Sequence, residues 1–256
     1  MSTFDTYRDR YRDILLRRED GILEVRMKSE GWRPINGLHE QLVGLFRDIA
    51  DDPENAIVIL SGVGDVFSTG FNMEGLPPLD AMVITPQAWD RSFRTGRAMI
   101  DNLLAIEIPI IGAVNGPAFI HAEILVMSDI VIASEKAAFA DKAHMTMNVV
   151  PGDGVHVWWP MLLGPNRARY FLLLGEEIGA EEAKRLDIVS ELLPHEQLMD
   201  RAWTIARELA QRPPAALRYS RHLLTRDLRR RMADELGYGM MLEGMALITP
   251  ASAKTA

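Results

Sequence analysis

The sequence contains no cysteine, so disulfide bonds, a thiol nucleophile and thiolate metal ligands are all excluded. Long apolar runs are also missing, because no window reaches the ~18 continuous apolar residues of a membrane-spanning helix. The opening segment, MSTFDTYRDRYRDILLRRED, lacks the apolar stretch of a secretory signal. These absences predict a soluble, cytoplasmic protein with no membrane partner.

Positive charge is in short supply. The chain carries 28 Lys and Arg residues against 36 Asp and Glu residues, which gives a net charge of −8 at pH 7. Only the segment TRDLRRRM (225–232) concentrates basic residues, whereas a nucleic-acid-binding protein needs a continuous basic face. We therefore expect no nucleic-acid partner. The 256 residues, 48% of them apolar, suffice for one large domain or for a domain with an appendage.

Several catalytic motifs are missing as well. The sequence has no HExxH or other closely spaced set of metal ligands, so no metal is expected. The absence of a GxSxG elbow, a P-loop and a GxGxxG fingerprint argues against α/β-hydrolases, P-loop nucleotidases and Rossmann dehydrogenases. A serine hydrolase built on Ser68 or Ser128 would lack its nucleophile elbow.

Apolar patterns predict strands and helices that alternate along most of the chain. Strands are predicted at 22–28, 56–62, 109–116 and 129–134, and helices at 38–50, 88–104 and 121–127. This alternation is typical of βα units with buried, largely parallel sheets. From about residue 196 the pattern is helical only. We therefore expect a core at 1–195 and a C-terminal helical region at 196–256.

Two loops that follow predicted strands carry candidate functional residues. In GDVFSTGFNMEGL (64–76), glycines allow backbone N–H groups to point at a ligand, although an ordinary turn also explains them. In NGPAFIHAEILVMSD (115–129), His121 is near a helix start, either as a core residue or as a hydrogen-bond donor to an oxyanion. Glu123 lies among apolar neighbours and needs a partner if it is buried.

The segment HMTMNVVPGDG (144–154) places a histidine and a carboxylate on either side of a turn. If the turn returns Asp153 toward His144, the pair suits a general base acting on water. Asp153 also has the position of a helix N-cap before VHVWW, and both roles stay open at this point. The remaining histidines show no partner pattern and are expected at the surface: His39, His156, His195 and His222.

The order of these segments resembles the crotonase (enoyl-CoA hydratase/isomerase) superfamily over nearly the whole chain. The matching stretches are AIVILSGVGDVFSTGFNMEGL, IPIIGAVNGPA, EILVMSDIVIASEKAAFAD, VVPGDG and LLLGEEIGAEEAKRLDIVSELL. The resemblance implies an α/β fold, namely a crotonase-like spiral of ββα units forming two near-perpendicular sheets, with a C-terminal helical trimerisation region. It also implies a homotrimer or a dimer of trimers.

The departures from the family pattern concern the site. CoA-thioester enzymes of the family usually carry a glycine run after NG.A, where this sequence has FIHAE (119–123). Glu123 aligns with one hydratase glutamate, but His144 replaces the second. These changes resemble the branch of carbon–carbon bond hydrolases typified by 6-oxocamphor hydrolase. That branch cleaves β-diketones by a retro-Claisen reaction without CoA or metal.

Resemblance to this branch implies the catalytic residues His121, His144, Asp153 and Glu243, and no cofactor. The implied reaction is hydrolysis of a small-molecule 1,3-diketone to a keto acid, with water activated by a His144–Asp153 dyad. The expected apolar pocket draws its substrate-binding residues from several segments: Trp32, Phe71, Met73, Met145, Met147 and Trp158.

Two alternatives stay open. A CoA-thioester hydratase, isomerase or hydrolase on the same fold would use Glu123 as its acid/base. A non-catalytic scaffold would scatter the candidate polar residues, whereas an enzyme would bring them to one apolar pocket.

Overall fold

The computed structural model describes residues 3–34, 36–77 and 84–248. Its main sheet has six strands in the order β1-β2-β3-β4-β6-β9. The hairpin of β1 (Ile14–Glu19) and β2 (Ile22–Met27) is antiparallel, and every other pair is parallel. The other strands are β3 (Ile57–Gly62), β4 (Ile110–Val114), β6 (Ile130–Ser134) and β9 (Glu191–Leu193). The predicted parallel sheet is confirmed.

A second, smaller sheet has the strand order β5-β7-β8. Its strands are β5 (Pro117–Ala118), β7 (Ala138–Phe139) and β8 (Ile178–Gly179). Strand β5 follows β4 after a short turn, and β7 follows β6 in the same way, so these two long strands each lead into a strand of the small sheet. This repetition, together with the intervening helices, confirms the expected α/β fold of crotonase type.

Burial on both faces explains why the central strands read as continuous apolar runs. In β3, Val58 and Leu60 point into one core cluster, whereas Ile57 and Ile59 point into another on the opposite face. Alternate side chains of a strand face opposite sides of a sheet, so a strand covered twice has no polar side. Each sheet face is covered by its own set of helices.

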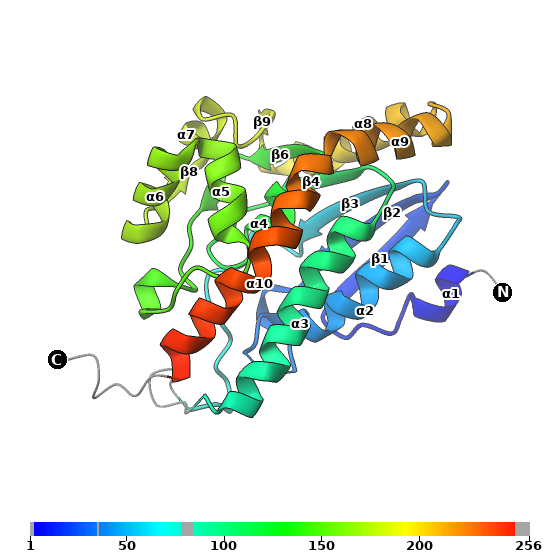
Figure 1. Cartoon of the computed structure of the whole chain (residues 1–256). Coiled ribbons are helices and arrows are strands. Elements are labelled where there is room, and N and C mark those ends of the chain that lie inside the picture. The colour runs from blue at the N-terminus through cyan, green and yellow to red at the C-terminus, as the bar shows by residue number, and fades with distance from the viewer. Residues whose placement is uncertain (1–2, 35, 78–83, 249–256) are drawn as a thin grey trace.

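On one face, α2 (Leu38–Asp51) and α3 (Pro86–Ala105) lie side by side across the sheet (Figure 1). Helix α3 begins at the N-cap Thr85, whose side chain accepts from the N–H of Ala88, with a proline in the first helical position. On the other face, α8 (Leu198–Ala210) buries Leu198, Ala202 and Trp203 against the strands. Both predicted early helices are confirmed within a few residues.

The remaining elements surround this framework. They are α1 (Thr3–Tyr7), η1 (Ser29–Gly31), α4 (Glu123–Val126), η3 (Met145–Met147), α5 (Val155–Leu163), α6 (Pro165–Leu174), α7 (Ala180–Arg185), η4 (His195–Gln197), α9 (Pro214–Leu224) and α10 (Arg226–Ile248). Up to Ile248, the helices expected after residue 196 are observed as α8, α9 and α10, and residues 249–256 lie outside the described residues. The division into a core at 1–195 and a helical region at 196–256 stays a prediction. Helix α10 runs between α3 and α5 (Figure 1).

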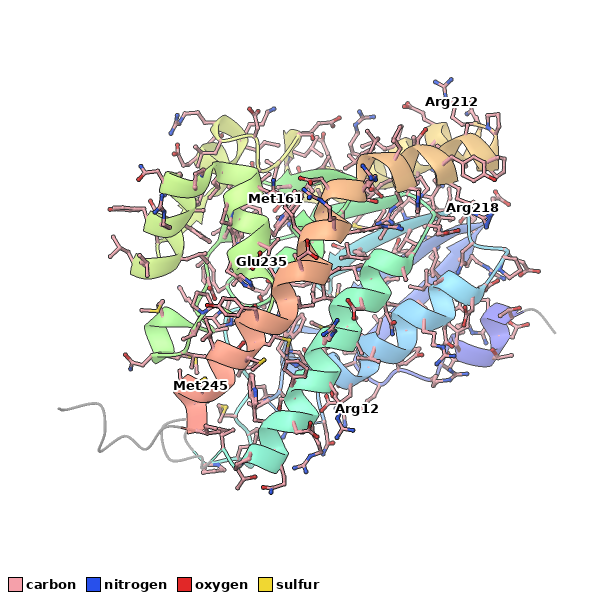
Figure 2. All side chains as sticks on the ribbon, in the orientation of Figure 1. Arg12, Met161, Arg212, Arg218, Glu235 and Met245 are labelled. Carbon is pink, nitrogen blue, oxygen red and sulfur yellow. The ribbon has the colours of Figure 1, made fainter. Side chains whose placement is uncertain are left out.

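Charged side chains project outward from the helical surface, as Arg212 and Arg218 do in Figure 2. Large apolar side chains are exposed on the same helices, including Tyr219 and Leu224 of α9 and Met241 and Met245 of α10. Within the described ranges, none of the helices combines the length and apolar character needed to cross a membrane.

Candidate active site

His121 lies in the turn between β5 and α4, where the chain leaves the small sheet. Its backbone is left-handed, with a φ of 53°, which is uncommon for a residue other than glycine. The buried ring has a partner on each side. Nδ1 lies 2.8 Å from Oε1 of Glu123, and Nε2 lies 2.7 Å from Nε2 of His39. Glu123 thus has the partner that a buried carboxylate requires.

Ser68 holds this turn in place. Its Oγ donates to the carbonyl of Ile120 at 2.6 Å and accepts from the N–H groups of Phe119 and Ile120, both at 3.1 Å. The hydroxyl is fully buried and bound to backbone on both sides. Ser68 therefore positions the loop that carries His121, which argues against a role as a nucleophile.

The surface position expected for His39 is wrong. The residue is half-buried in the first turn of α2, where Glu40 accepts from the N–H of Gly37 at 3.0 Å. Burial, and then the charge of His121, lower the pKa of His39 to about 3, so its ring is neutral. The backbone of Arg33 offsets a smaller part of this lowering of the pKa. His39 therefore accepts at Nε2 from the Nε2–H of His121.

Trp32 forms the wall behind His121. Its ring is fully buried and stacks on the imidazole of His121, with centroids 5.0 Å apart and an angle of 24° between the planes. The indole Nε1–H donates to the carbonyl of Phe67 at 3.2 Å. The structure thus brings Trp32 against a predicted catalytic histidine, and its contact with a substrate stays a prediction.

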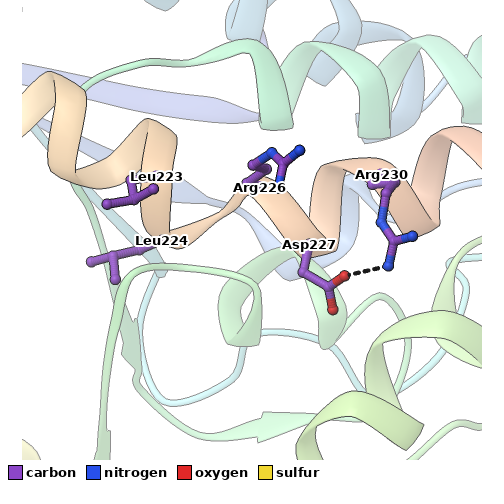
Figure 3. Close-up of a pocket in the computed structure, with 5 residues that line it drawn as sticks. All are labelled: Leu223, Leu224, Arg226, Asp227 and Arg230. Atoms are coloured by element: carbon purple, nitrogen blue, oxygen red, sulfur yellow. Dashed lines mark hydrogen bonds and ion pairs between the residues drawn. The ribbon is translucent and has the colours of Figure 1, made fainter.

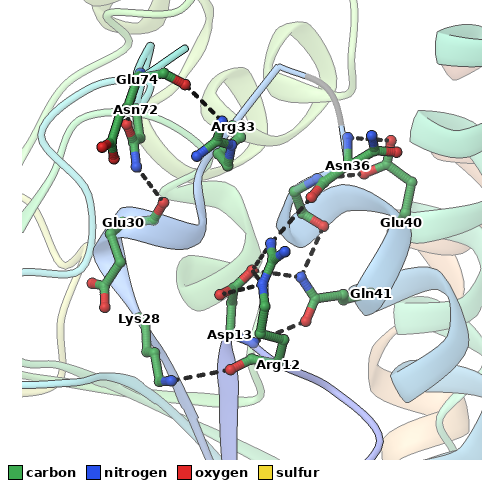
Figure 4. Close-up of polar contacts among 11 residues, drawn as sticks. Arg12, Asp13, Lys28, Glu30, Arg33, Asn36, Glu40, Gln41, Asn72 and Glu74 are labelled. Carbon is green, nitrogen blue, oxygen red and sulfur yellow. Dashed lines mark hydrogen bonds and ion pairs between the residues drawn. The ribbon is translucent and has the colours of Figure 1, made fainter.

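Polar contacts tie the segment around Trp32 to the loop that follows β3 (Figure 4). The guanidinium of Arg33 donates to the carbonyl of Glu74 at 2.7 Å, and the amide of Asn72 donates to the carbonyl of Glu30 at 3.0 Å. Two segments far apart in the chain are thereby fixed to one another. This framework sets the position of the aromatic ring against the site.

His144 is buried in the turn between β7 and α5 and faces two carboxylates. Its Nδ1 lies 2.7 Å from Oδ1 of Asp141, and its Nε2 lies 3.5 Å from Oδ2 of Asp153. The same Oδ2 is 3.7 Å from Nδ1 of His121, so Asp153 lies between the two histidines. The turn does return Asp153 to His144. Sequence reasoning missed Asp141, although FADKAH displays a carboxylate three residues before the histidine.

Asp153 makes no capping bond to α5, so the capping role considered for it is not observed. The N-cap is Gly154, whose φ of 109° is a conformation that glycine adopts easily. Oδ1 of Asp153 has no protein partner among the described residues. Burial alone would raise the pKa of Asp153, but His144 and then His121 lower it below its usual range. Asp153 is therefore a carboxylate at neutral pH.

Glu243 reaches the same turn from α10. A methyl group placed on Gly152 would lie 2.9 Å from Cβ of Glu243 and 2.3 Å from the carbonyl oxygen of Gly239, so the helix packs directly on the turn. Burial, and then the charge of Asp153, raise the pKa of Glu243 to about 8. Glu243 is therefore a neutral acid at pH 7, with a proton to give.

Both site histidines hold their protons strongly. Burial opposes a charge on His144, but the carboxylates of Asp153 and Asp141 outweigh it and raise its pKa well above the usual value. Burial likewise opposes a charge on His121, and Glu123 outweighs it, so this pKa is raised as well. His144 is therefore a strong base whose free form becomes more abundant as the pH rises.

Phe71 lies beside the two neighbouring histidines. Its ring centroid is 6.3 Å from that of His121 and 6.4 Å from that of His39. Met73 is half-buried two residues further along the same loop. Of the expected apolar wall residues, Phe71 and Trp32 are thus the ones with ring contacts to His121.

The other expected wall residues flank His144 in the chain. Met145 and Met147 form η3 directly after it, and Met145 is 37% exposed. Trp158 is half-buried in α5, and its Nε1 has no protein partner among the described residues. These three side chains lie on elements adjacent to the site, and their contact with a substrate stays a prediction.

Three polar side chains around His121 have the spacing of metal ligands. His121, Glu123 and Asp153 each offer one ligand atom within 4.8 Å of the others. A histidine nitrogen that binds a metal must be deprotonated, whereas Nδ1 of His121 is in hydrogen-bond contact with the carboxylate of Glu123. The arrangement therefore suits proton transfer better than metal binding.

A surface hollow of about 370 Å³ lies at the junction of α9 and α10 (Figure 3). Its lining residues are Leu223, Leu224, Arg226, Asp227 and Arg230. Asp227 forms an ion pair with Arg230 at 2.8 Å across it. It shares no residue with the cluster around His144, so it is a separate surface feature.

The fold and this cluster define a member of the crotonase superfamily. A model of the enoyl-CoA hydratase/isomerase family matches residues 18–245, and the chain belongs to that family. Among solved structures, a β-diketone hydrolase from the cyanobacterium Anabaena sp. PCC 7120, bound to (S)-3-oxocyclohexyl acetic acid, superimposes with a TM-score of 0.87. It is 39% identical and covers 97% of both chains. The resemblance to the superfamily and to its β-diketone hydrolase branch is confirmed.

Two other relatives carry different names. An enoyl-CoA hydratase/isomerase from Mycobacterium paratuberculosis superimposes with a TM-score of 0.84 at 24% identity, covering 93% of this chain and 94% of that one, and shares the fold. A carnitinyl-CoA dehydratase from Shigella flexneri is 28% identical over 206 residues, which are 79% of this chain and 76% of the dehydratase. The family therefore includes enzymes of CoA thioesters.

Proposed function

We propose that this chain is a β-diketone hydrolase that uses water to cleave a carbon–carbon bond of a 1,3-diketone and forms a keto acid. The observation that carries this proposal is the half-buried Asp153 carboxylate between His121 and His144, with Glu243 packed on the same turn. The similar Anabaena hydrolase supports it, because its bound (S)-3-oxocyclohexyl acetic acid is itself a keto acid.

In the first step, His144 activates water. With Nδ1 against Asp141, the nitrogen available to a water molecule is Nε2, on the side of Asp153. His144 takes one proton as the water oxygen attacks one carbonyl carbon, and Asp153 balances the positive charge that forms. Such a general base contributes roughly 10²–10⁴-fold to the rate.

His121 binds the oxyanion that this attack creates. Its Nε2–H, which points at His39 before substrate binds, becomes the donor to the substrate oxygen once that oxygen replaces His39 as the acceptor. The amide of Phe71 supplies a second donor in this proposal. Loss of one oxyanion donor typically costs about 10²–10³-fold in kcat.

Glu243 completes the reaction. When the tetrahedral intermediate collapses, the carbon–carbon bond breaks and its electron pair passes into an enolate that the second carbonyl stabilises. The neutral carboxyl group of Glu243 protonates the enolate carbon, and the proton held by His144 returns the glutamate to its acid form. The sum of the steps is one cyclic diketone plus one water giving one keto acid, whereas a linear diketone gives one ketone and one carboxylic acid.

Chemistry on a CoA thioester is the second candidate, favoured by the 28% identity to a carnitinyl-CoA dehydratase. It would use Glu123 as acid and base. In this chain Glu123 is buried and bonded to His121 at 2.8 Å, which commits the carboxylate to the histidine. This contact favours the diketone reaction.

A substrate screen tests the proposal. Bicyclic and linear 1,3-diketones are incubated with the protein, and loss of their ultraviolet absorbance is followed by product analysis. In H₂¹⁸O we expect one ¹⁸O atom in the new carboxylate. Acetoacetyl-CoA is titrated in parallel by calorimetry, and tight binding together with inert diketones would favour the CoA-thioester alternative.

We also propose that the chain assembles as a homotrimer or as a dimer of trimers. Exposed apolar side chains on the last helices support self-association, among them Tyr219, Leu223, Leu224, Met241 and Met245. Light scattering coupled to size exclusion measures the mass directly, and a monomer at micromolar concentration would contradict this proposal.

A further inference from the structure

Asp141 is a buried carboxylate with one dedicated partner. Its Oδ1 lies 2.7 Å from Nδ1 of His144, three residues along the chain, and both side chains are almost fully buried. Its Oδ2 has no protein partner among the described residues. Burying a carboxylate is costly, so a group in this position persists where its single strong contact serves a purpose.

The backbone around Asp141 is tied to the strand that leads to His121. The N–H of Ala140 donates to the carbonyl of Ala118 at 3.2 Å, and the N–H of Lys142 donates to the carbonyl of Phe119 at 2.7 Å. Asp141 is thus held by bonds on both sides of it. The same turn therefore fixes the distance between the two catalytic loops and the direction of this carboxylate.

We propose that Asp141 is the positioning residue of His144: it holds the proton on Nδ1, so that Nε2 is the nitrogen that faces Asp153 and exchanges protons. This inference rests on the proposed function, in which Nε2 activates water. An ionised aspartate can only accept hydrogen bonds, so a nitrogen 2.7 Å from it carries a proton. Neutral His144 is accordingly the Nδ1–H tautomer.

Asp141 and Asp153 therefore have different roles toward His144. Asp141 contacts Nδ1 closely and orients the ring, whereas Asp153 lies at a looser 3.5 Å from Nε2, which leaves that side open to a proton transfer. Two other titratable groups face the same space, His121 from the loop before α4 and Glu243 from α10. Among the described residues, the carboxylate of Asp141 has a hydrogen bond to His144 alone, so a variant at Asp141 tests this contact.

Nuclear magnetic resonance of ¹⁵N-histidine-labelled protein tests the tautomer without any substrate. At a pH above its titration, His144 in the unmodified protein should give the nitrogen shifts of an Nδ1–H imidazole. In D141N, which removes the charge and keeps the shape, the titration of His144 should move down by about one pH unit or more. An Nε2–H tautomer in the unmodified protein overturns the proposal even if D141N does not fold.

Kinetics give the second readout. We expect kcat of D141N to fall by roughly 10²–10⁴-fold with KM within about threefold, and the acid limb of the kcat/KM profile to move to lower pH. D141E should recover part of the rate. E177Q is the matched control, because Glu177 is exposed directly before β8 and contacts the turn of Asp141 from outside, 3.2 Å from the ammonium of Lys142.

The outcomes separate the two proposals. If diketones are inert but the tautomer and the shifted titration are found, the proposed function fails and the role of Asp141 as the partner that positions His144 stands. If diketones are cleaved but His144 titrates identically in folded D141N, the role of Asp141 fails and the function stands.

Discussion

His39 and His121 meet ring to ring, with their Nε2 atoms 2.7 Å apart, although one lies in the first turn of α2 and the other precedes α4. Two imidazole nitrogens at this distance must share one proton. Because burial keeps His39 neutral, the donor is His121, whose pKa is raised. His39 thus occupies the place of a hydrogen-bond acceptor next to the proposed carbonyl site.

Replacement of His39 by Ala should separate stability from catalysis. Loss of an acceptor for a charged donor is expected to lower the free energy of unfolding by about 1–3 kcal/mol. The value of kcat should stay within about tenfold, because the substrate oxygen takes over as acceptor. Urea unfolding and steady-state kinetics measure both, with H222A on an exposed position of α9 as the control. The reference is H121A, which lacks the proposed oxyanion donor. If kcat of H39A falls as far as kcat of H121A, His39 itself acts on the substrate.

Replacement of His144 by Ala should abolish turnover while leaving the fold intact. The base is lost, and we expect kcat to fall by at least roughly 10²–10⁴-fold. Circular dichroism and oligomeric mass check the fold. Near-normal activity in a correctly folded H144A protein would rule out His144 as the base.

Glu243→Gln tests the acid. Glutamine mimics the neutral carboxyl group in shape but has no proton to give, so kcat should drop by roughly 10²-fold or more with little change in KM. The unfolded chain ionises Glu243 near 4.5, whereas the folded protein keeps the proton to about pH 8, so stability falls as pH rises between these values. E243Q should therefore be more stable than the unmodified protein at pH 7, by about 1–3 kcal/mol. The difference between the urea midpoints of E243Q and the unmodified protein should therefore be larger at pH 8 than at pH 5. The same difference at both pH values would contradict a buried neutral Glu243.

The pH profile of kcat/KM is expected to be bell-shaped. On the acid side His144 must lose a proton to act as base, and its raised pKa moves this limb above the usual histidine range. On the alkaline side the rate falls as Glu243 loses its proton near pH 8. The pKa values that the two limbs report are macroscopic values of the whole coupled cluster, not of single residues. The alkaline limb should disappear in E243Q, and its persistence would assign that limb to another group.

Metal removal should leave the reaction unchanged. His121, Glu123 and Asp153 have ligand-like spacing, but the contact between Nδ1 of His121 and Glu123 keeps a proton where a metal would need a lone pair. We expect equal kcat before and after dialysis against a chelator, with metal content measured by mass spectrometry. A rate that is lost on dialysis and restored by one divalent ion would identify a metal enzyme.

The sequence allowed accurate prediction wherever burial imposes a regular pattern. Strands β2, β3, β4 and β6 lie within or close to their predicted ranges. Strands β3, β4 and β6 are mostly apolar because both of their faces are covered, whereas β2 was predicted from its alternating pattern. Strand β1 was not predicted, because an edge strand carries charged residues, here Arg17, Arg18 and Glu19. The two-residue strands of the small sheet are too short for any period to show.

Prediction of the site had a similar limit. His121, His144 and Asp153 were identified by their loops and by family resemblance, and the structure brings them together. Asp141 and His39 were not identified, because their roles depend on the direction in which a side chain leaves a turn or a helix. Local spacing does not encode that direction, and the contact that reveals His39 spans 82 residues.

The packing of α10 on the Gly152 turn has a consequence for the timing of catalysis. A ribosome releases the histidines and Asp153 well before it releases Glu243, so a nascent chain can complete both sheets and still lack its acid. In the proposed reaction, competence for catalysis is therefore acquired with the last helix.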